Sequence, residues 1–149
     1  MQVYRGCAFP EDLLYDVERD VWVRFVDGIA TFGMTDPAQT RCGKFVAVGF
    51  RPVGKLVARG RSLATIESAK WVGPFPAPLT CEIIAANEET FARDMLIANR
   101  DPYGEGWLVK ARPTRWDDER GNLLDAEQAF AAYRRKIEEW KINCLRCED

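Results

Sequence analysis

Short apolar runs alternate with turn residues through the middle of the chain. Between residues 21 and 113 there are seven runs rich in Val, Ile, Phe and Trp: VWVRF, IATFG, FVAVGF, KLVA, LATIE, EIIAAN and GWLVKA. Glycine or proline separates them at intervals of about 8 to 12 residues, a spacing typical of all-β sandwiches and barrels. Turn residues at 27–28, 51–54 and 58–60 fit the gaps between strands. We therefore predict a mainly β fold with its core at about residues 21–113.

Two segments have helical rather than strand patterning. In TDPAQTRCG, we expect Asp36 to be the N-cap, Pro37 the first helical residue and Gly43 the terminator of a short helix. From about residue 125 to 141, apolar side chains recur at steps of three and four: Ala126, Phe130, Tyr133, Ile137 and Trp140. Asp125 and Gln128 form a capping-box pattern at the start of this helix. We expect it to cover an open side of the β unit, with residues 142–149 as a flexible tail.

Length and composition indicate one globular domain spanning residues 1–149. The chain is 47% hydrophobic and 30% charged, and no segment approaches the 18 or so consecutive apolar residues of a membrane span. The first residues, MQVYRGCAFPEDLL, have no apolar core of a secretory signal. We expect a cytoplasmic protein that does not contact a membrane, and a monomer, because no dimerisation motif is present.

Cysteine and histidine usage narrows the chemistry. Five cysteines, an odd number, in a chain without an export signal predict no structural disulfide framework. We expect Cys42 and Cys81 to pack as small apolar residues. The chain has no histidine, which excludes Ser-His-Asp and Cys-His catalysis and any histidine-ligated metal site. We therefore predict no metal centre.

Basic residues concentrate in one part of the sequence. The net charge is -2, yet residues 41–70 contain seven basic side chains and one acid, Glu67. The basic residues are Arg41, Lys44, Arg51, Lys55, Arg59, Arg61 and Lys70. The acidic pI of about 5.3 argues against nucleic acid as the partner. A docking face for an acidic protein partner fits this pattern better.

Lys70 lies between two extended runs. Residues 63–67 alternate as a strand, and Trp71-Val72 begin a second run before Gly73-Pro74. This pattern predicts a hairpin with the lysine at its tip. A hydrated tip lysine is a poor base or nucleophile, and taken alone it reads as an ordinary turn residue.

The neighbouring motifs resemble those of the glycine cleavage system H-protein family and related lipoyl carriers. They are WVR (22–24), IATFGMTDPAQ (29–39), VG (53–54), IESAK (66–70), AAN (85–87) and NRDPYGEGWL (99–108). The resemblance implies the β hybrid barrel of lipoyl and biotinyl domains, with short helices and a C-terminal helix. It also implies that Lys70 carries lipoate as an amide on its ε-amine. A mobile arm of this kind delivers its cargo at high effective concentration and makes the chain a non-catalytic carrier.

Two neighbours of the lysine leave alternatives open, and one motif further along the chain has an expected structural role. Glu67 is either part of the surface that a lipoate-protein ligase or lipoyl transferase recognises, or a plain solvated carboxylate. Trp71 either packs on the hairpin or shelters the dithiolane. In DPYGEGWL we expect two glycines with unusual backbone angles and two core residues, Trp107 and Leu108.

Several positions depart from the usual H-protein pattern. These are DVWVR at 20–24, GPFPAPLTC at 73–81 with Cys81 in place of a turn glycine, and the terminal CLRCED. They resemble the lipoate-binding proteins that work with a heterodisulfide-reductase-like complex in bacterial sulfur oxidation. The expected cargo is then a sulfur intermediate. The alternative is the aminomethyl group of glycine cleavage, with glycine decarboxylase, aminomethyltransferase and dihydrolipoamide dehydrogenase as partners.

Cys144 and Cys147 form a CxxC pair near the end of the chain. Such a pair can form a redox disulfide or half of a zinc site. No second CxxC or histidine accompanies it, so two free thiols on a frayed tail are the simpler interpretation. If the arm carries sulfur, these thiols could exchange with an arm-bound persulfide.

Two other function classes compete with the carrier hypothesis for the whole chain: a redox enzyme that uses its own thiols, and an interaction module with an unmodified lysine.

Overall fold

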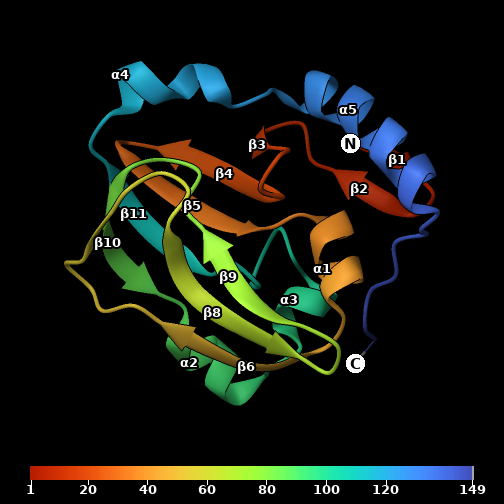
Figure 1. Ribbon diagram of the computed structural model, residues 1–149, viewed down its shortest axis with the longest axis horizontal. Helices are drawn as coiled ribbons and strands as arrows, with labels where there is room; N and C mark the ends of the chain where they lie inside the picture. Colours follow the sequence, from red (N-terminus) through yellow and green to blue (C-terminus); the bar gives the residue numbers. More distant parts are fainter. Residues whose placement is uncertain (149) are drawn as a thin grey trace.

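The computed structural model describes residues 1–148, and its core is formed by two antiparallel sheets (Figure 1). The six-stranded sheet has the order β3-β4-β5-β11-β10-β7, and the three-stranded sheet the order β6-β8-β9. The strands of the first sheet are β3 (Leu14–Asp16), β4 (Val21–Val26), β5 (Ile29–Met34), β11 (Val109–Pro113), β10 (Cys81–Ala86) and β7 (Leu56–Val57). Those of the second are β6 (Phe45–Phe50), β8 (Ser62–Ser68) and β9 (Val72–Pro76). The prediction of a mainly β fold with a C-terminal helix is confirmed.

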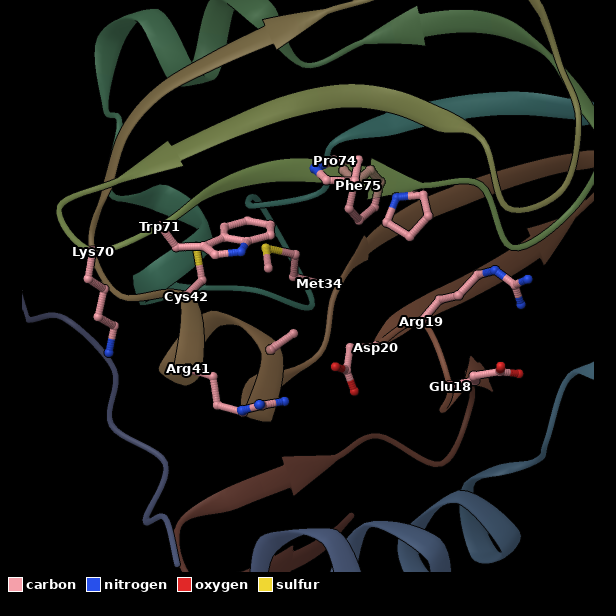
Figure 2. A pocket seen from close by; sticks show the side chains of 12 residues that line it. Glu18, Arg19, Asp20, Met34, Arg41, Cys42, Lys70, Trp71, Pro74 and Phe75 are labelled. Atoms are coloured by element: carbon pink, nitrogen blue, oxygen red, sulfur yellow. The ribbon is translucent and has the colours of Figure 1, made fainter. Parts of the chain in front are cut away.

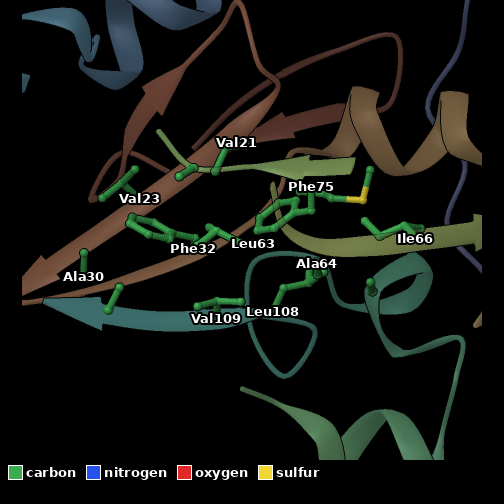
Figure 3. Close-up of a cluster of buried hydrophobic side chains, with 14 of the residues drawn as sticks. Val21, Val23, Ala30, Phe32, Leu63, Ala64, Ile66, Phe75, Leu108 and Val109 are labelled. Atoms are coloured by element: carbon green, nitrogen blue, oxygen red, sulfur yellow. The ribbon is translucent and has the colours of Figure 1, made fainter. Parts of the chain in front are cut away.

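The main hydrophobic core contains residues from both sheets. Phe32 of β5, Leu63 and Ile66 of β8 and Phe75 of β9 are all almost fully buried, and Figure 3 shows them facing one another. From Ala64 onward, alternation within β8 explains this arrangement, since Thr65 and Glu67 on the other face are exposed. The register shift between Ser62 and Ala64 accompanies the burial of Leu63. The predicted strands are present, with one change of boundary: GWL is not part of β11, which begins only at Val109.

Helix α1 (Asp36–Cys42) lies where the sequence predicts a short helix, but its N-cap is different. Thr35, not Asp36, is the N-cap, and its hydroxyl accepts a hydrogen bond from Ala38 N at 3.3 Å. Asp36 begins the helix, and its carboxylate is used for longer-range contacts described below. The helix ends as predicted at Gly43, which has a φ of 85°.

Helix α5 (Ala126–Trp140) has the predicted capping box between Asp125 and Gln128. It packs on three N-terminal strands that the sequence analysis did not predict: β1 (Gln2–Tyr4), β2 (Cys7–Phe9) and β3. Together they form a second core, in which Phe9 stacks on Tyr133 with a centroid distance of 5.0 Å. The β unit therefore extends well before residue 21. Strands of three residues are too short to show the alternation of apolar and polar residues from which strands are predicted.

Four short helical segments were also not predicted: α2 (Glu88–Arg93), α3 (Ile97–Arg100), α4 (Trp116–Glu119) and η1 (Arg120–Asn122). They are held by tertiary packing. Phe91 of α2, for example, stacks on Phe45 of β6. Among the described helices, α5 is the longest with 15 residues, and none has the length and apolarity needed to cross a membrane.

The C-terminal segment differs from the predicted flexible tail. Cys144 forms a disulfide with Cys7, contrary to the expectation of no structural disulfide, and residues 145–147 hydrogen-bond to α1 and to Asn99. The two cysteines are 137 residues apart in sequence. Only the tertiary fold brings them together, so counting cysteines could not identify the pair. The predicted tail extends to residue 149, which lies outside the described residues.

Candidate functional site

Lys70 lies at the tip of the β8–β9 hairpin and is exposed (Figure 2). The tip is closed by a hydrogen bond from Ser68 N to Trp71 O of 2.7 Å. The stem of Lys70 lies against the end of α1: a Cβ placed on Gly43 would be only 2.9 Å from Lys70 Cε. The structure thus places the amine at an accessible point on a hydrogen-bonded hairpin, as the sequence predicts.

Ser68 fixes the root of the lysine to α1. Its hydroxyl donates to Cys42 O at 2.6 Å and accepts from Lys70 N at 3.3 Å. Ser68 is itself buried. The tip therefore keeps a defined position relative to the helix, while the lysine side chain is exposed.

Asn99 supports the turn that joins α1 to β6, directly beneath Lys70. Its side-chain oxygen accepts from Phe45 N at 2.9 Å, and its nitrogen donates to Gly43 O at 2.9 Å. The same nitrogen is 3.2 Å from Gln39 Oε1. Sequence reasoning did not assign this role to Asn99, although the residue belongs to the diagnostic NRDPYGEGWL block.

A cleft of about 570 Å³ begins at Lys70 and runs between the hairpin and α1. Its walls are largely apolar and include Met34, Ala38, Cys42, Trp71 and Phe75. Figure 2 shows charged side chains gathered at the end away from Lys70: Glu18, Arg19 and Asp20 from the β3–β4 turn, with Arg41 on the α1 side. The cleft has no signature in the sequence, because its lining comes from separate segments without a shared motif.

Asp20 is the best-anchored carboxylate of the cleft. Its backbone is left-handed with a φ of 60°, and its carboxylate accepts a hydrogen bond from Tyr133 OH at 2.8 Å. Burial raises the pKa of Asp20 above its ordinary value, although the Tyr133 hydrogen bond, Lys136 and Arg41 oppose this effect. A cation entering the cleft would stabilise the charged form.

The two guanidinium groups of the cleft differ in their partners. Arg19 is paired with Asp16 at 3.1 Å. Arg41 stacks on the Trp140 ring with its Cζ 3.7 Å from the centroid, and within residues 1–148 it forms no ion pair. Arg41 is therefore held by an aromatic ring, with its charge left available at the cleft.

The position of Trp71 is compatible with both roles that the sequence left open, packing on the hairpin and sheltering the dithiolane. A Cβ on Gly73 would lie 2.2 Å from the Trp71 ring, so the indole lies closely over the backbone of its own hairpin. The same ring lines the cleft and remains 41% exposed. Packing on the hairpin is observed, and a sheltering role remains a prediction.

Glu67 is exposed on the outer face of the three-stranded sheet. Its neighbours on the adjacent strands are Ala47 of β6 and Val72 of β9, both exposed. This outer face thus carries a carboxylate flanked by small or apolar side chains close to Lys70. Recognition of Glu67 by a ligase stays a prediction.

The basic segment does not form a single face around the lysine. Arg41 and Lys44 lie at the same end of the barrel as Lys70, whereas Arg51, Lys55, Arg59 and Arg61 belong to the loop at the opposite end (Figure 1). The strand β6 separates the two groups, since it begins beside Ser68 and ends beside Ala64. A docking face made of all seven residues is therefore incorrect.

The DPYGEGWL block is structural, as expected, but for a different reason. Gly104 and Gly106 have no left-handed backbone angle. A Cβ at Gly106 would instead lie 2.7 Å from Ala98 Cα and from Asp101 O, so the glycine is required for close packing. Leu108 is fully buried as predicted, and Trp107 is partly buried against the second core.

The cysteines fall into two groups. Cys42 and Cys81 are buried free thiols, as predicted, and burial raises the pKa of Cys81 to about 12. Cys144 is not a free thiol in this structure, which corrects the expectation of two accessory thiols on the tail. Cys147 is free and half-buried. Direct exchange of an arm-bound persulfide with a Cys144-Cys147 dithiol would first require reduction of the disulfide.

Comparisons with known proteins agree with this geometry. A family model described as "Glycine cleavage H-protein" matches residues 13–136. The chain is 41% identical over 145 residues to "Glycine cleavage system H protein 2" of Aquifex aeolicus, covering 97% of this chain and 89% of that one. It is 40% identical over 152 residues to "Probable glycine cleavage system H protein 2" of Sulfolobus acidocaldarius, covering 99% and 100%.

A solved structure extends the comparison to the fold. The crystal structure of a glycine cleavage system H protein from Mycobacterium marinum superposes with a TM-score of 0.72 at 30% identity, covering 84% of this chain and 98% of that one. Proteins of this kind carry a covalently attached lipoate on a lysine. On this evidence the chain belongs to the glycine cleavage H-protein family of lipoyl carriers.

Proposed function

We propose that Lys70 is the lipoylated residue and that the chain is a non-catalytic carrier. The position of Lys70 at an exposed, firmly anchored hairpin tip supports this assignment. An amide-linked lipoyl group extends about 14 Å from the Cα, from ordinary bond lengths. When bound, it supplies the reversible thiol and disulfide chemistry by which the carrier accepts and releases cargo. Cys42 and Trp71 would flank the attachment point at Lys70, and the cleft would receive the outer part of the lipoyl group.

The cargo that the cleft supports best is a cationic one, the aminomethyl group of glycine cleavage. The observation that carries this proposal is the partly buried carboxylate of Asp20 at the end of the apolar cleft, with the exposed Glu18 also on the lining. An ammonium group beside Asp20 would be attracted electrostatically in a partly desolvated site, and of the two guanidinium groups nearby Arg19 is already paired with Asp16. The names of the relatives point the same way. The expected partners are glycine decarboxylase, aminomethyltransferase and dihydrolipoamide dehydrogenase.

A sulfur intermediate is the second candidate cargo, and Arg41 favours it. A guanidinium without an ion-pair partner among residues 1–148 is suited to an anionic sulfur group, such as a persulfide or a sulfonate. The partner would then be a heterodisulfide-reductase-like complex, as the sequence departures predict. The nearby carboxylates oppose an anion, so we rank this candidate second.

The attachment site is tested by mass. After incubation with lipoate, ATP and a lipoate-protein ligase, the intact chain should gain one lipoyl group, and Lys70→Arg should gain none. Lys44→Arg, an exposed lysine at the same end of the barrel, is the matched control and should be modified normally. Modification of the Lys70→Arg chain at another lysine would overturn the assignment.

The cargo is tested by reconstitution. Incubation of the lipoylated chain with glycine and glycine decarboxylase should add the mass of one aminomethyl group and release carbon dioxide. Asp20→Asn should shorten the lifetime of this loaded form, because the cation loses a carboxylate. Absence of loading with glycine, combined with a persulfide or sulfonate adduct on the arm in the presence of a sulfur donor, would favour the second candidate.

Two further assignments complete the proposal. We place Glu67 in the surface read by the ligase, and Glu67→Gln should slow lipoylation without changing stability, because the side chain is exposed. We also place the chain in the cytoplasm, where the partner enzymes of either route are expected. Subcellular fractionation of the native organism tests the location.

A further inference from the structure

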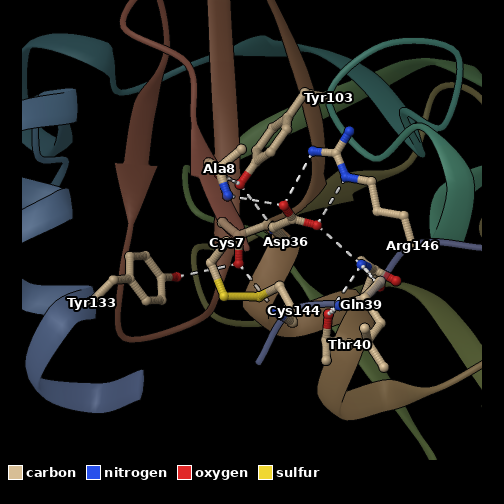
Figure 4. The surroundings of a disulfide bond; sticks show 12 residues. Cys7, Ala8, Asp36, Gln39, Thr40, Tyr103, Tyr133, Cys144 and Arg146 are labelled. Carbon is tan, nitrogen blue, oxygen red and sulfur yellow. Dashed lines mark hydrogen bonds and ion pairs between the residues drawn. A yellow bond between two sulfur atoms is a disulfide. The ribbon is translucent and has the colours of Figure 1, made fainter. Parts of the chain in front are cut away.

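The C-terminal segment lies along α1 from one end to the other (Figure 4). Leu145 N donates to Thr40 Oγ1 at 3.2 Å, and Gln39 Nε2 donates to Leu145 O at 2.8 Å. Cys147 N donates to Asn99 O at 3.0 Å. Asn99 in turn supports the turn beneath Lys70. The segment therefore links the disulfide to the root of the proposed arm.

The same segment neutralises a buried charge. Asp36 is 0% exposed, and Arg146 donates to its two oxygens at 3.2 and 3.1 Å. The other donors to this carboxylate are the neutral groups Ala8 N and Gln39 Nε2. A buried carboxylate is costly without a paired cation. The N-terminal end of α1 thus depends on Arg146, from the irregular segment that follows α5.

The Cys7–Cys144 disulfide holds this segment in place. It joins β2 to the chain two residues before Arg146, and Cys144 N also donates to Arg5 O at 2.9 Å. The fit is close, since a Cβ on Gly6 would lie 2.7 Å from Cys144 O. Tethering keeps Arg146 at a high effective concentration near Asp36. Without the bond, this segment depends on the contacts of residues 145–147 with α1 and Asn99.

We propose that Cys7 and Cys144 form a reversible redox site, a latch that holds residues 142–148 on α1 when oxidised and releases them when reduced. The reductant is a dithiol: two thiols of the donor close to a disulfide, and two electrons and two protons pass to Cys7 and Cys144 as thiols. Structural disulfides are rare in reducing compartments, so a disulfide in a carrier that works among dithiols fits a reversible site.

The latch acts on the cleft through α1. This helix contributes Ala38, Arg41 and Cys42 to the wall, and its C-terminal turn receives the hydrogen bonds of Ser68 and Asn99. Release of the segment removes the cation from Asp36 and loosens the helix. The lipoyl arm should then spend less time in the cleft. This consequence rests on the proposed carrier function, whereas release of the segment does not.

The first experiment measures the latch alone. The lipoylated chain, purified without reductant, is denatured, alkylated and mapped before and after dithiothreitol. Cys42, Cys81 and Cys147 should be labelled in both samples, and Cys7 and Cys144 only after reduction. On the native protein, trypsin cleavage after Lys141 should accelerate about tenfold or more on reduction, because cleavage follows the population of the released state.

Four variants make the result specific. Trypsin should cleave Cys144→Ser rapidly with or without dithiothreitol. If Cys144→Ser does not fold, Cys7→Ser takes its place. Cys147→Ser, the matched control in the same segment, should keep the full response. Lys70→Arg should also keep it, because the latch does not need the arm. Alkylation of Cys7 and Cys144 without reductant, or a cleavage rate that reduction leaves unchanged, would overturn the proposal.

The second experiment measures the consequence for the arm. The rate at which dihydrolipoamide dehydrogenase and NADH reduce the oxidised arm should be several-fold higher in Cys144→Ser than in Cys147→Ser. Equal rates would overturn the link between latch and cleft. If neither variant becomes lipoylated, the carrier function fails, and the proteolysis result still decides the latch.

Discussion

The hydroxyl of Ser68 donates a 2.6 Å hydrogen bond to the carbonyl of Cys42, 26 residues earlier in the chain. This contact joins the hairpin that carries Lys70 to the last turn of α1, which forms one wall of the cleft. The root of the arm and the cleft therefore belong to one packed unit. A lipoyl group attached to Lys70 would move relative to a fixed base.

Ser68→Ala should loosen that base. The substitution leaves the buried Cys42 carbonyl without its donor, which costs about 1 to 2 kcal/mol of unfolding free energy. It also removes the acceptor of Lys70 N, so the rate of enzymatic lipoylation should fall. Urea denaturation and a ligase assay measure the two effects.

Thr65→Ala is the matched control for Ser68→Ala. Thr65 lies on the same strand but is exposed, so its loss should change stability by less than about 0.5 kcal/mol. Equal stability of the two variants would show that the Ser68 contact does not hold the hairpin.

The hairpin and its lysine could be predicted because the signals are local. Alternation in 63–67 defines β8, and the turn residues that follow define the return strand. The proposal that Lys70 is the modified residue comes from a motif, not from physics. A solvated tip lysine has no property of its own that indicates lipoylation.

The cleft and the disulfide could not be predicted because their parts are distant in sequence. Asp20 and Arg41 meet only after β4 and β5 have folded back onto each other and α1 has packed on them. Cys7 and Cys144 depend on the docking of α5. Gly106 illustrates the same limit, since its requirement comes from α3 rather than from its own backbone angle.

Gly106→Ala should destabilise the fold. The added methyl would meet Ala98 Cα and the carbonyls of Ile97 and Asp101 at 2.7 to 2.8 Å, and these are backbone atoms that cannot rotate away. Overpacking of this kind costs about 1 to 3 kcal/mol. Gly121→Ala is the matched control, because nothing lies within 4 Å of its Cβ position, and it should be neutral or slightly stabilising. Thermal denaturation compares the two, and a similar Tm would contradict the packing role.

Asp125→Ala should weaken the attachment of α5. The variant loses the capping box, in which Asp125 accepts from Gln128 N at 2.8 Å, and the expected cost is about 1 kcal/mol. Glu127→Ala, in the exposed first turn of the same helix, should cost less, because it removes only a favourable charge near the helix N-terminus. Urea denaturation of both variants checks the order, and the reverse order would refute the role of the cap.

Asp20→Asn should stabilise the protein at neutral pH and remove part of its pH dependence. Burial raises the pKa of Asp20 in the folded state, so the folded chain binds this proton more tightly than the unfolded chain. Its contribution to stability is therefore greatest at low pH and is lost as the pH rises through the folded pKa. Asparagine accepts the Tyr133 hydrogen bond and tolerates the left-handed backbone without acquiring charge.

The measurement is urea denaturation of both proteins at several values between about pH 4 and 7. The unfolding free energy of Asp20→Asn relative to the original chain should be larger at the high end of this range than at the low end, and should level off once the pH exceeds the folded-state pKa of Asp20. Asp27→Asn is the matched control, because Asp27 also has a left-handed backbone, with a φ of 52°, but is exposed. A difference that does not vary with pH would show that the Asp20 carboxylate is not destabilised in the folded state, and the case for a cation-binding end of the cleft would lose its main support.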